Sequence, residues 1–209
     1  MQATQLWELI RIERQRLSTL LDDLDTPEWQ AASLSQMWSV RHVVAHLAAA
    51  GSTGTSRWLL NMVLSGFNTD RHNERLLNKY WGTSAQQTLE NFNRSCDQAQ
   101  AVFNSAPALL GEIVVHGQDI AVALGKKLEQ DPAAIREVAR FFSAQDFAVN
   151  SKTLIKDLKL IATDDSFTAG HGAAVRGKLL ELVMTMAGKP AFLQHLEGEG
   201  VEVLRRRLQ

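Results

Sequence analysis

The chain has 209 residues, 45% of them hydrophobic and 22% charged, and 22 Lys and Arg against 23 Asp and Glu give a formal net charge of -1. This is the composition of a soluble globular protein, and without a basic excess we expect no binding to nucleic acid and none to a membrane. The single cysteine, Cys96, excludes an intramolecular disulfide, and no apolar stretch predicts a signal peptide or a spanning helix, so we expect a cytoplasmic protein.

Four long segments have the apolar spacing of amphipathic helices, which predicts a four-helix bundle. Ser39 can cap the second of them, which we expect to continue past two glycines. A capping box from Ser84 to Gln87 opens the third, and Gly125 suits the C-cap of the fourth. A polar stretch, residues 68–80, separates the second segment from the third. The four segments are residues 4–24, 39–62, 84–103 and 108–124.

The pattern changes towards the C-terminus of the chain. A fifth helical stretch is expected from Asp131 to about Ala148. Beyond it, residues 158–163 and 173–176 have the composition of short strands between glycine-rich turns, and residues 179–187 return to helical spacing. We therefore predict a mainly α protein, with a helical bundle domain over residues 1–150 and a small α+β domain over residues 151–209.

Glu112 and His116 are the first candidates for chemistry, because they lie four residues apart on the predicted fourth helix. This spacing places both side chains on one face, about one turn from each other. Their apolar neighbours predict a buried helix, where a carboxylate is costly unless it is paired or coordinated. A metal ion would satisfy both side chains, although a specific hydrogen-bond partner would also satisfy the glutamate.

His46 lies in an apolar run of the second helix and could supply a third ligand from a facing helix. Two imidazoles and one carboxylate leave an open coordination position, as in catalytic zinc sites. His42 and His46 form a rival pair four residues apart, but His42 begins the helix and is expected nearer to solvent. Spacing alone leaves a second interpretation open, in which these are hydrogen-bonded core residues without a metal.

Three segments resemble the mycothiol-dependent maleylpyruvate isomerase family within the wider DinB-like metal-binding bundles. They are WSVRHVVAHL (residues 38–47), GEIVVHGQDI (residues 111–120) and, between residues 160 and 188, LIATD, GHG, VRG and MAG. They occur in the order that the family has, and the similarity covers nearly the whole chain. It implies that His46, Glu112 and His116 match three metal ligands, usually assigned to zinc, and that mycothiol is the thiol cosubstrate.

The chain departs from the family pattern at three places. Residues 119–125 read DIAVALG where many relatives have DIRRPLG, Phe167 replaces a common tryptophan, and Lys189 stands where arginine is usual. Arginine binds a carboxylate through two parallel hydrogen bonds, which lysine cannot form. These differences therefore leave the identity of the substrate undetermined. Arg176 is a candidate contact for a substrate carboxylate, with Arg57 and Lys189 as alternatives, and Asp119 is a candidate for orienting a ligand.

The resemblance implies a small-molecule substrate and a reaction at an activated thiol. A thiolate adds to a cis double bond conjugated to a carbonyl, the resulting single bond rotates, and elimination gives the trans product. Two alternatives remain: a mycothiol-dependent S-transferase, in which the thiol stays attached to the product, and a metal-binding helical module without catalysis.

Overall fold

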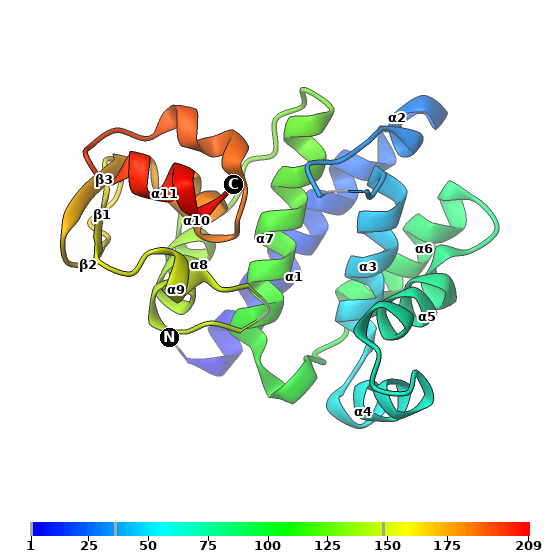
Figure 1. Ribbon diagram of the computed structural model, residues 1–209. Coiled ribbons are helices and arrows are strands. Elements are labelled where there is room, and N and C mark those ends of the chain that lie inside the picture. Colours follow the sequence, from blue (N-terminus) through cyan, green and yellow to red (C-terminus); the bar gives the residue numbers. More distant parts are fainter. Residues whose placement is uncertain (1, 36, 148) are drawn as a thin grey trace. The chain divides into compact units, whose positions relative to one another are not determined.

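The computed structural model describes residues 2–35, 37–147 and 149–209, and the chain divides into two compact units (Figure 1). Unit 1 is Met1–Asp131 and unit 2 is Pro132–Gln209. The division precedes the helix that starts at Pro132 instead of falling near residue 150. The physical reason is that this helix packs against a helix of unit 2, Leu179–Met186.

Unit 1 is helical, and its centre is the expected four-helix bundle (Figure 1). The bundle consists of α1, α3, α6 and α7, which contact one another around a shared core, while α5 packs on α3 and α6. The elements of this unit are α1 (Ala3–Asp22), α2 (Thr26–Gln30), α3 (Val40–Ser52), α4 (Thr55–Leu64), α5 (Thr69–Trp81), α6 (Ala85–Cys96), the 3-10 turn η1 (Val102–Asn104) and α7 (Ala106–Ala123).

The core of unit 1 is formed by aliphatic and aromatic side chains from all four bundle helices, together with Trp29 of α2. Each such side chain, when fully buried, contributes about 1.5–3 kcal/mol of hydrophobic free energy. From this apolar core we expect the bundle to fold without a metal. The buried members are Leu17, Leu21, Trp29, Val40, Val43, Val44, Leu47, Ala48, Leu89, Phe92, Ile113 and Ile120.

The second predicted helix is broken in two. Thr53 is extended, with φ -113° and ψ 109°, so α3 ends at Ser52 and α4 starts at Thr55. Before the break, Gly51 provides space for a buried arginine: a Cβ at this position would lie 2.4 Å from Nη2 of Arg14. The glycine therefore serves close packing inside the bundle.

Two further predictions for unit 1 need correction. The polar stretch 68–80 is a helix, α5, which the Asn68 side chain caps by accepting a hydrogen bond from the Arg71 N–H at 2.9 Å. The third helix ends at Cys96 and does not reach Phe103. Nη1 of Arg14 donates to the carbonyls of Ser95 and of residue 98 at 2.9 and 3.0 Å, and so satisfies groups that the helix end leaves free.

Unit 2 combines a small sheet with short helices. Its strands are β1 (Leu158–Ala162), β2 (Thr168–Gly170) and β3 (Ala173–Gly177), in the order β2-β1-β3. β1 pairs with β2 antiparallel, with Leu160 opposite Ala169, and with β3 parallel. The helical elements are α8 (Pro132–Ala144), α9 (Ser151–Leu154), α10 (Leu179–Met186), the 3-10 turn η2 (Pro190–His195) and α11 (Val201–Arg207).

The strands and the α10 helix confirm the expected α+β character of this part, and β2 is an addition that its three residues were too few to predict. α8 ends at Ala144, earlier than expected, and Ala148 lies outside the described residues. In the part of the chain that the structure describes, no helix has the length and apolar character needed to cross a membrane.

Candidate metal centre

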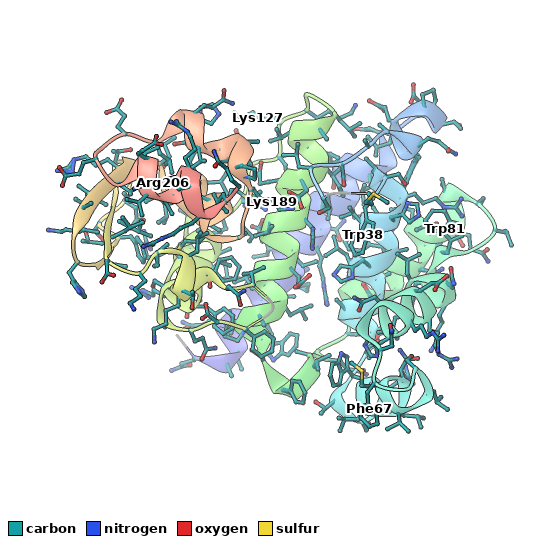
Figure 2. The ribbon with its side chains drawn as sticks, in the orientation of Figure 1. Trp38, Phe67, Trp81, Lys127, Lys189 and Arg206 are labelled. Carbon is teal, nitrogen blue, oxygen red and sulfur yellow. The ribbon has the colours of Figure 1, made fainter. Side chains whose placement is uncertain are left out.

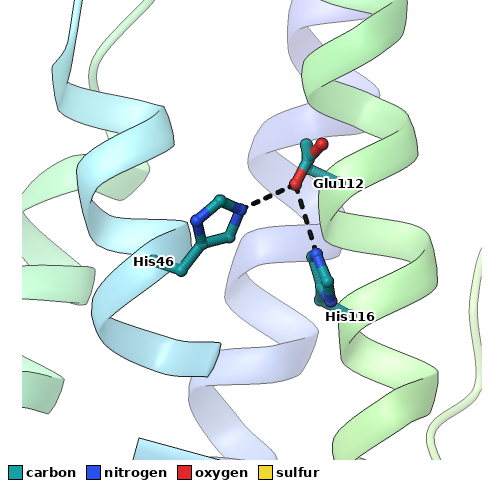
Figure 3. A group of neighbouring side chains, drawn as sticks. All are labelled: His46, Glu112 and His116. Atoms are coloured by element: carbon teal, nitrogen blue, oxygen red, sulfur yellow. Dashed lines mark hydrogen bonds and ion pairs between the residues drawn. The ribbon is translucent and has the colours of Figure 1, made fainter. Parts of the chain in front are cut away.

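His46, Glu112 and His116 come together between α3 and α7, and we call them the His-Glu-His cluster (Figure 3). α3 buries its apolar face, including Val43 and Leu47, in the bundle core, and this orientation leaves His46 at the edge that faces α7. α7 carries Glu112 and His116 one turn apart on the stripe facing α3. Helix packing alone therefore brings the three side chains to one place.

The geometry of the cluster suits a single metal ion. Oε2 of Glu112 lies 2.9 Å from Nε2 of His46 and 3.3 Å from Nε2 of His116. One ligand atom from each residue lies within 4.8 Å of the others. The side chains are 29%, 24% and 16% exposed for His46, Glu112 and His116, so an ion and a small molecule could reach them from solvent.

The donor set matches a divalent transition metal. Two imidazole nitrogens and one carboxylate oxygen are ligands that zinc accepts, and three protein ligands are the number found in catalytic zinc sites. The residues present therefore fit such an ion, and His46, Glu112 and His116 are the residues that would hold it.

The protonation states of Glu112 and His116 depend on each other. Burial alone would raise the pKa of the Glu112 carboxyl, but hydrogen bonds with His116 and His46 hold it well below its usual range. Burial would likewise lower the pKa of His116, but hydrogen bonds to Asp119 and Glu112 outweigh it and raise that pKa to about 9. An entering cation would therefore compete with a proton for His116.

Asp119 contacts His116 from the side opposite the cluster. Its Oδ2 lies 3.0 Å from Nδ1 of His116 and accepts a hydrogen bond from the Ser35 hydroxyl at 2.7 Å. Asp119 is completely buried, whereas Ser35 belongs to the loop before α3. This is the contact that the predicted orienting role of Asp119 requires, and the role itself stays a prediction.

Two residues beside the cluster were not identified as functional from the sequence. Ser35 contacts both Asp119 and His116, and no spacing pattern links it to either residue. Trp38, interpreted from the sequence as a packing residue, has its ring centroid 5.0 Å from that of His46 and 6.3 Å from that of His116 (Figure 2). Its position in the segment WSVRHVVAHL, two turns before His46, is the only signal that could have indicated this.

The rival histidine lies elsewhere on α3. The ring of His42 packs against Trp81 at a tilted angle, with centroids 4.4 Å apart, and its Nδ1 lies 2.7 Å from Oγ of Ser39, the N-cap of α3. It is not a member of the cluster. Among the described residues, the His-Glu-His cluster is the group of three that the structure brings within the reach of one ion.

The candidates for binding a substrate carboxylate lie on different elements. Arg57 is exposed on α4 of unit 1, and Lys189 follows α10 of unit 2. Arg176 is exposed on β3 of unit 2, where its backbone pairs with that of Glu197 through hydrogen bonds of 2.7 and 2.8 Å. A role for any of the three in substrate binding stays a prediction.

Residues 9–142, more than half of the chain, match the model of the DinB superfamily. The chain belongs to the DinB superfamily. The match includes α3 and α7, so all three residues of the His-Glu-His cluster lie inside the DinB region. No curated protein sequence matches this chain.

The DinB chain is also similar to two solved structures. One is the crystal structure of the mycothiol-dependent maleylpyruvate isomerase, with 13% sequence identity and a TM-score of 0.67. The other is a histidine-to-alanine mutant of that isomerase, with 14% identity and a TM-score of 0.66. Each comparison covers 95% of this chain and 93% of the other. The fold expected from the sequence resemblance is therefore confirmed over nearly the whole chain.

Proposed function

We propose that this protein is a metal-dependent enzyme that uses mycothiol or a similar low-molecular-weight thiol to isomerise maleylpyruvate or a related unsaturated acid from cis to trans. The observation that carries the proposal is the His-Glu-His cluster, whose ligand atoms lie within 4.8 Å of one another. The fold similarity to a mycothiol-dependent isomerase supports the choice of reaction. The proposal includes zinc as the metal and the cytoplasm as the location.

The side chains around the cluster have separate tasks in this proposal. A zinc-like ion held by three ligands would lower the pKa of a thiol bound at its open position. Asp119 keeps the proton of His116 on Nδ1, so that Nε2 is free to act as a ligand. Trp38 provides an apolar wall against both imidazoles and limits the access of water from that side.

The protein's own thiol is not suited to this reaction. Burial raises the pKa of Cys96 to about 11, and its Sγ contacts the carbonyl oxygen of Phe92 within its own helix at 3.5 Å. A thiol with this pKa is protonated at neutral pH and is a poor nucleophile. The nucleophile therefore has to come from an external thiol.

The experiment follows maleylpyruvate isomerisation with purified protein, with and without mycothiol, before and after metal removal. We expect turnover only when both the metal and the thiol are present, with no net loss of thiol, because elimination returns it. Cys96→Ala and His42→Ala should remain active, whereas His46→Ala should not. Stoichiometric loss of thiol would identify an S-transferase, and turnover without thiol would overturn the thiol mechanism.

A further inference from the structure

A groove between α4 and α5 has the size of a small-molecule site. It is open to solvent and has a volume of about 430 Å³, and none of its lining residues belongs to the His-Glu-His cluster. Both helices are part of unit 1. Its walls are formed by Arg57, Leu60 and Leu64 of α4 and by Arg75, Leu76 and Lys79 of α5.

The groove is lined by three cationic side chains and no acidic one. Nη1 of Arg57 donates to the backbone oxygen of Ser52 at 3.3 Å, and Nε of Arg75 donates to Oδ1 of Asn61 at 3.1 Å. Both acceptors are neutral. Within the described ranges of the chain, no ion pair involves Arg57, Arg75 or Lys79.

Arg75 is connected to the buried residue His72 through Asn61. The Oδ1 atom of Asn61 accepts the hydrogen bond from Arg75. On the other side of the same amide, Nδ2 donates to the backbone oxygen of His72 at 3.0 Å and lies 3.0 Å from Nδ1 of His72. His72 is only 2% exposed, and its ring packs against Trp58 with centroids 5.0 Å apart. The hydrogen bond to Asn61 favours one orientation of the exposed guanidinium, and this reduces the entropy cost of binding a ligand.

The same groove has an apolar wall that the protein leaves uncovered. Leu60 and Leu64 are each 59% exposed, and no residue of α4 is buried. Phe67, which follows α4, is 74% exposed at the same end of the unit (Figure 2). A ligand that covered the two leucines would remove apolar surface from water, and this favours binding.

We propose that the α4–α5 groove binds a small organic anion with an apolar body, of the class of alkyl monocarboxylates. The anionic group would be bound by Arg57, Arg75 and Lys79, and the alkyl chain would lie on the leucine wall. The groove is a recess of small-molecule volume between two helices, which favours a free monomeric acid over the surface of a membrane.

The experiment measures octanoate binding to the full chain by titration calorimetry, with 1-octanol as the uncharged analogue. We expect octanoate to bind at one site per chain and octanol at least about tenfold more weakly, because the charge-assisted hydrogen bonds are lost. Arg75→Gln and Lys79→Gln should each weaken octanoate binding about three- to tenfold, and Leu64→Ser should weaken both compounds. Circular dichroism of each variant verifies its fold.

Arg71→Gln is the matched control. Arg71 is an exposed residue of the same helix outside the groove lining, so the variant has the same change in net charge and should bind octanoate as the original chain does. Equal weakening by Arg71→Gln and Arg75→Gln would overturn the proposal, because the effect would then be one of net charge. Equal binding of octanol, or binding to phosphatidylglycerol vesicles without binding of monomeric octanoate, would also overturn it.

The groove and the metal centre can be tested separately. His46→Ala should lose metal and keep octanoate binding, whereas Arg75→Gln should keep its metal content. Loss of octanoate binding in His46→Ala would show that the acid binds at the metal centre, which would contradict a separate site.

Discussion

The carboxylate of Asp119 lies 3.0 Å from Nδ1 of His116 and is completely buried on the same helix. An ionised carboxylate can only accept hydrogen bonds, so the proton of the imidazole has to be on Nδ1. Nε2 then faces Glu112, where it carries the second proton of the charged imidazole and would exchange that proton for a metal ion. The Ser35 hydroxyl donates to the same oxygen of Asp119 and thereby connects the loop before α3 to this arrangement.

Replacing Asp119 with alanine should lower the affinity of the protein for zinc. The loss should be about 10- to 100-fold, the usual effect of removing a partner that orients a histidine ligand. Competition with a chromophoric chelator measures the affinity. Asp97→Ala removes an exposed carboxylate from unit 1 and should have no effect. Unchanged affinity in Asp119→Ala would show that the buried carboxylate serves the fold alone.

The three proposed ligands should each be necessary for a full complement of metal. We expect one zinc-like ion per chain, and substoichiometric metal in His46→Ala, Glu112→Ala and His116→Ala, because two ligands bind much more weakly than three. His42→Ala is the control on the same helix. Elemental analysis of the dialysed proteins gives the metal content, and loss in His42→Ala with retention in His46→Ala would identify the other histidine pair.

Removing the metal should leave the bundle folded. Its core consists of side chains such as Leu17, Val44, Phe92 and Ile113, which are buried independently of any ligand. We expect the helical circular dichroism signal to persist after chelation, while the melting temperature falls in proportion to the lost binding free energy. A collapse of the helical signal would show that the site is structural.

The thiol of Cys96 should react slowly with a disulfide reagent in the folded protein. Burial raises its pKa to about 11, which leaves about a hundredfold less thiolate at pH 8 than an ordinary cysteine with a pKa near 9. The reaction rate should therefore still rise with pH above pH 9. The chain unfolded in guanidinium chloride is the control and should react at the rate of a free cysteine.

The Arg136–Asp165 ion pair should make the stability of unit 2 depend on pH. Nε of Arg136 lies 2.9 and 3.1 Å from the two carboxylate oxygens of Asp165, and these hydrogen bonds hold the pKa of Asp165 below its usual range. A lowered pKa in the folded state contributes stability above the unfolded value, near pH 4. This contribution is lost as the pH falls through the folded value.

Thermal unfolding of Asp165→Asn tests this dependence. We expect the variant to melt below the original chain at pH 7 and the difference to shrink below pH 4. Glu202→Gln, which removes an exposed ion pair with Arg205, should melt as the original chain does at both values. A difference that is as large at pH 3 as at pH 7 would exclude the ion pair as its cause.

Periodicity predicted the bundle well because its helices bury a continuous apolar stripe. The Val43, Val44 and Leu47 pattern of α3 and the apolar run of α7 are signals of this kind. α5 escaped prediction because, of its described side chains, only His72 is buried, and a histidine gives no apolar signal. The close packing of Gly51 against the buried Arg14 likewise depends on a partner distant in sequence that no local pattern contains.

In the candidate site, too, the residues that could be predicted are those with a regular helical spacing. A spacing of four residues identified Glu112 and His116, since one helix fixes their geometry. His46 was preferred over His42 because it lies in an apolar run, and the family resemblance then implied the same residue. Ser35 and Trp38 reach the cluster from the segment before α3, and the direction of such a segment depends on tertiary packing that sequence spacing does not contain.

Gly170 and Gly172 of the segment GHG are required by the backbone of the small sheet in unit 2. Their φ angles are +74° and +115°, and a Cβ at either position would lie 2.2 Å from a backbone oxygen, that of Leu158 or that of Asp157. The histidine between them is exposed. A chain that forms this sheet with the same backbone needs glycine at both positions, whatever ligand it binds. The two glycines therefore report the backbone of the sheet, and substrate preference has to be sought in side chains that the backbone leaves free to change.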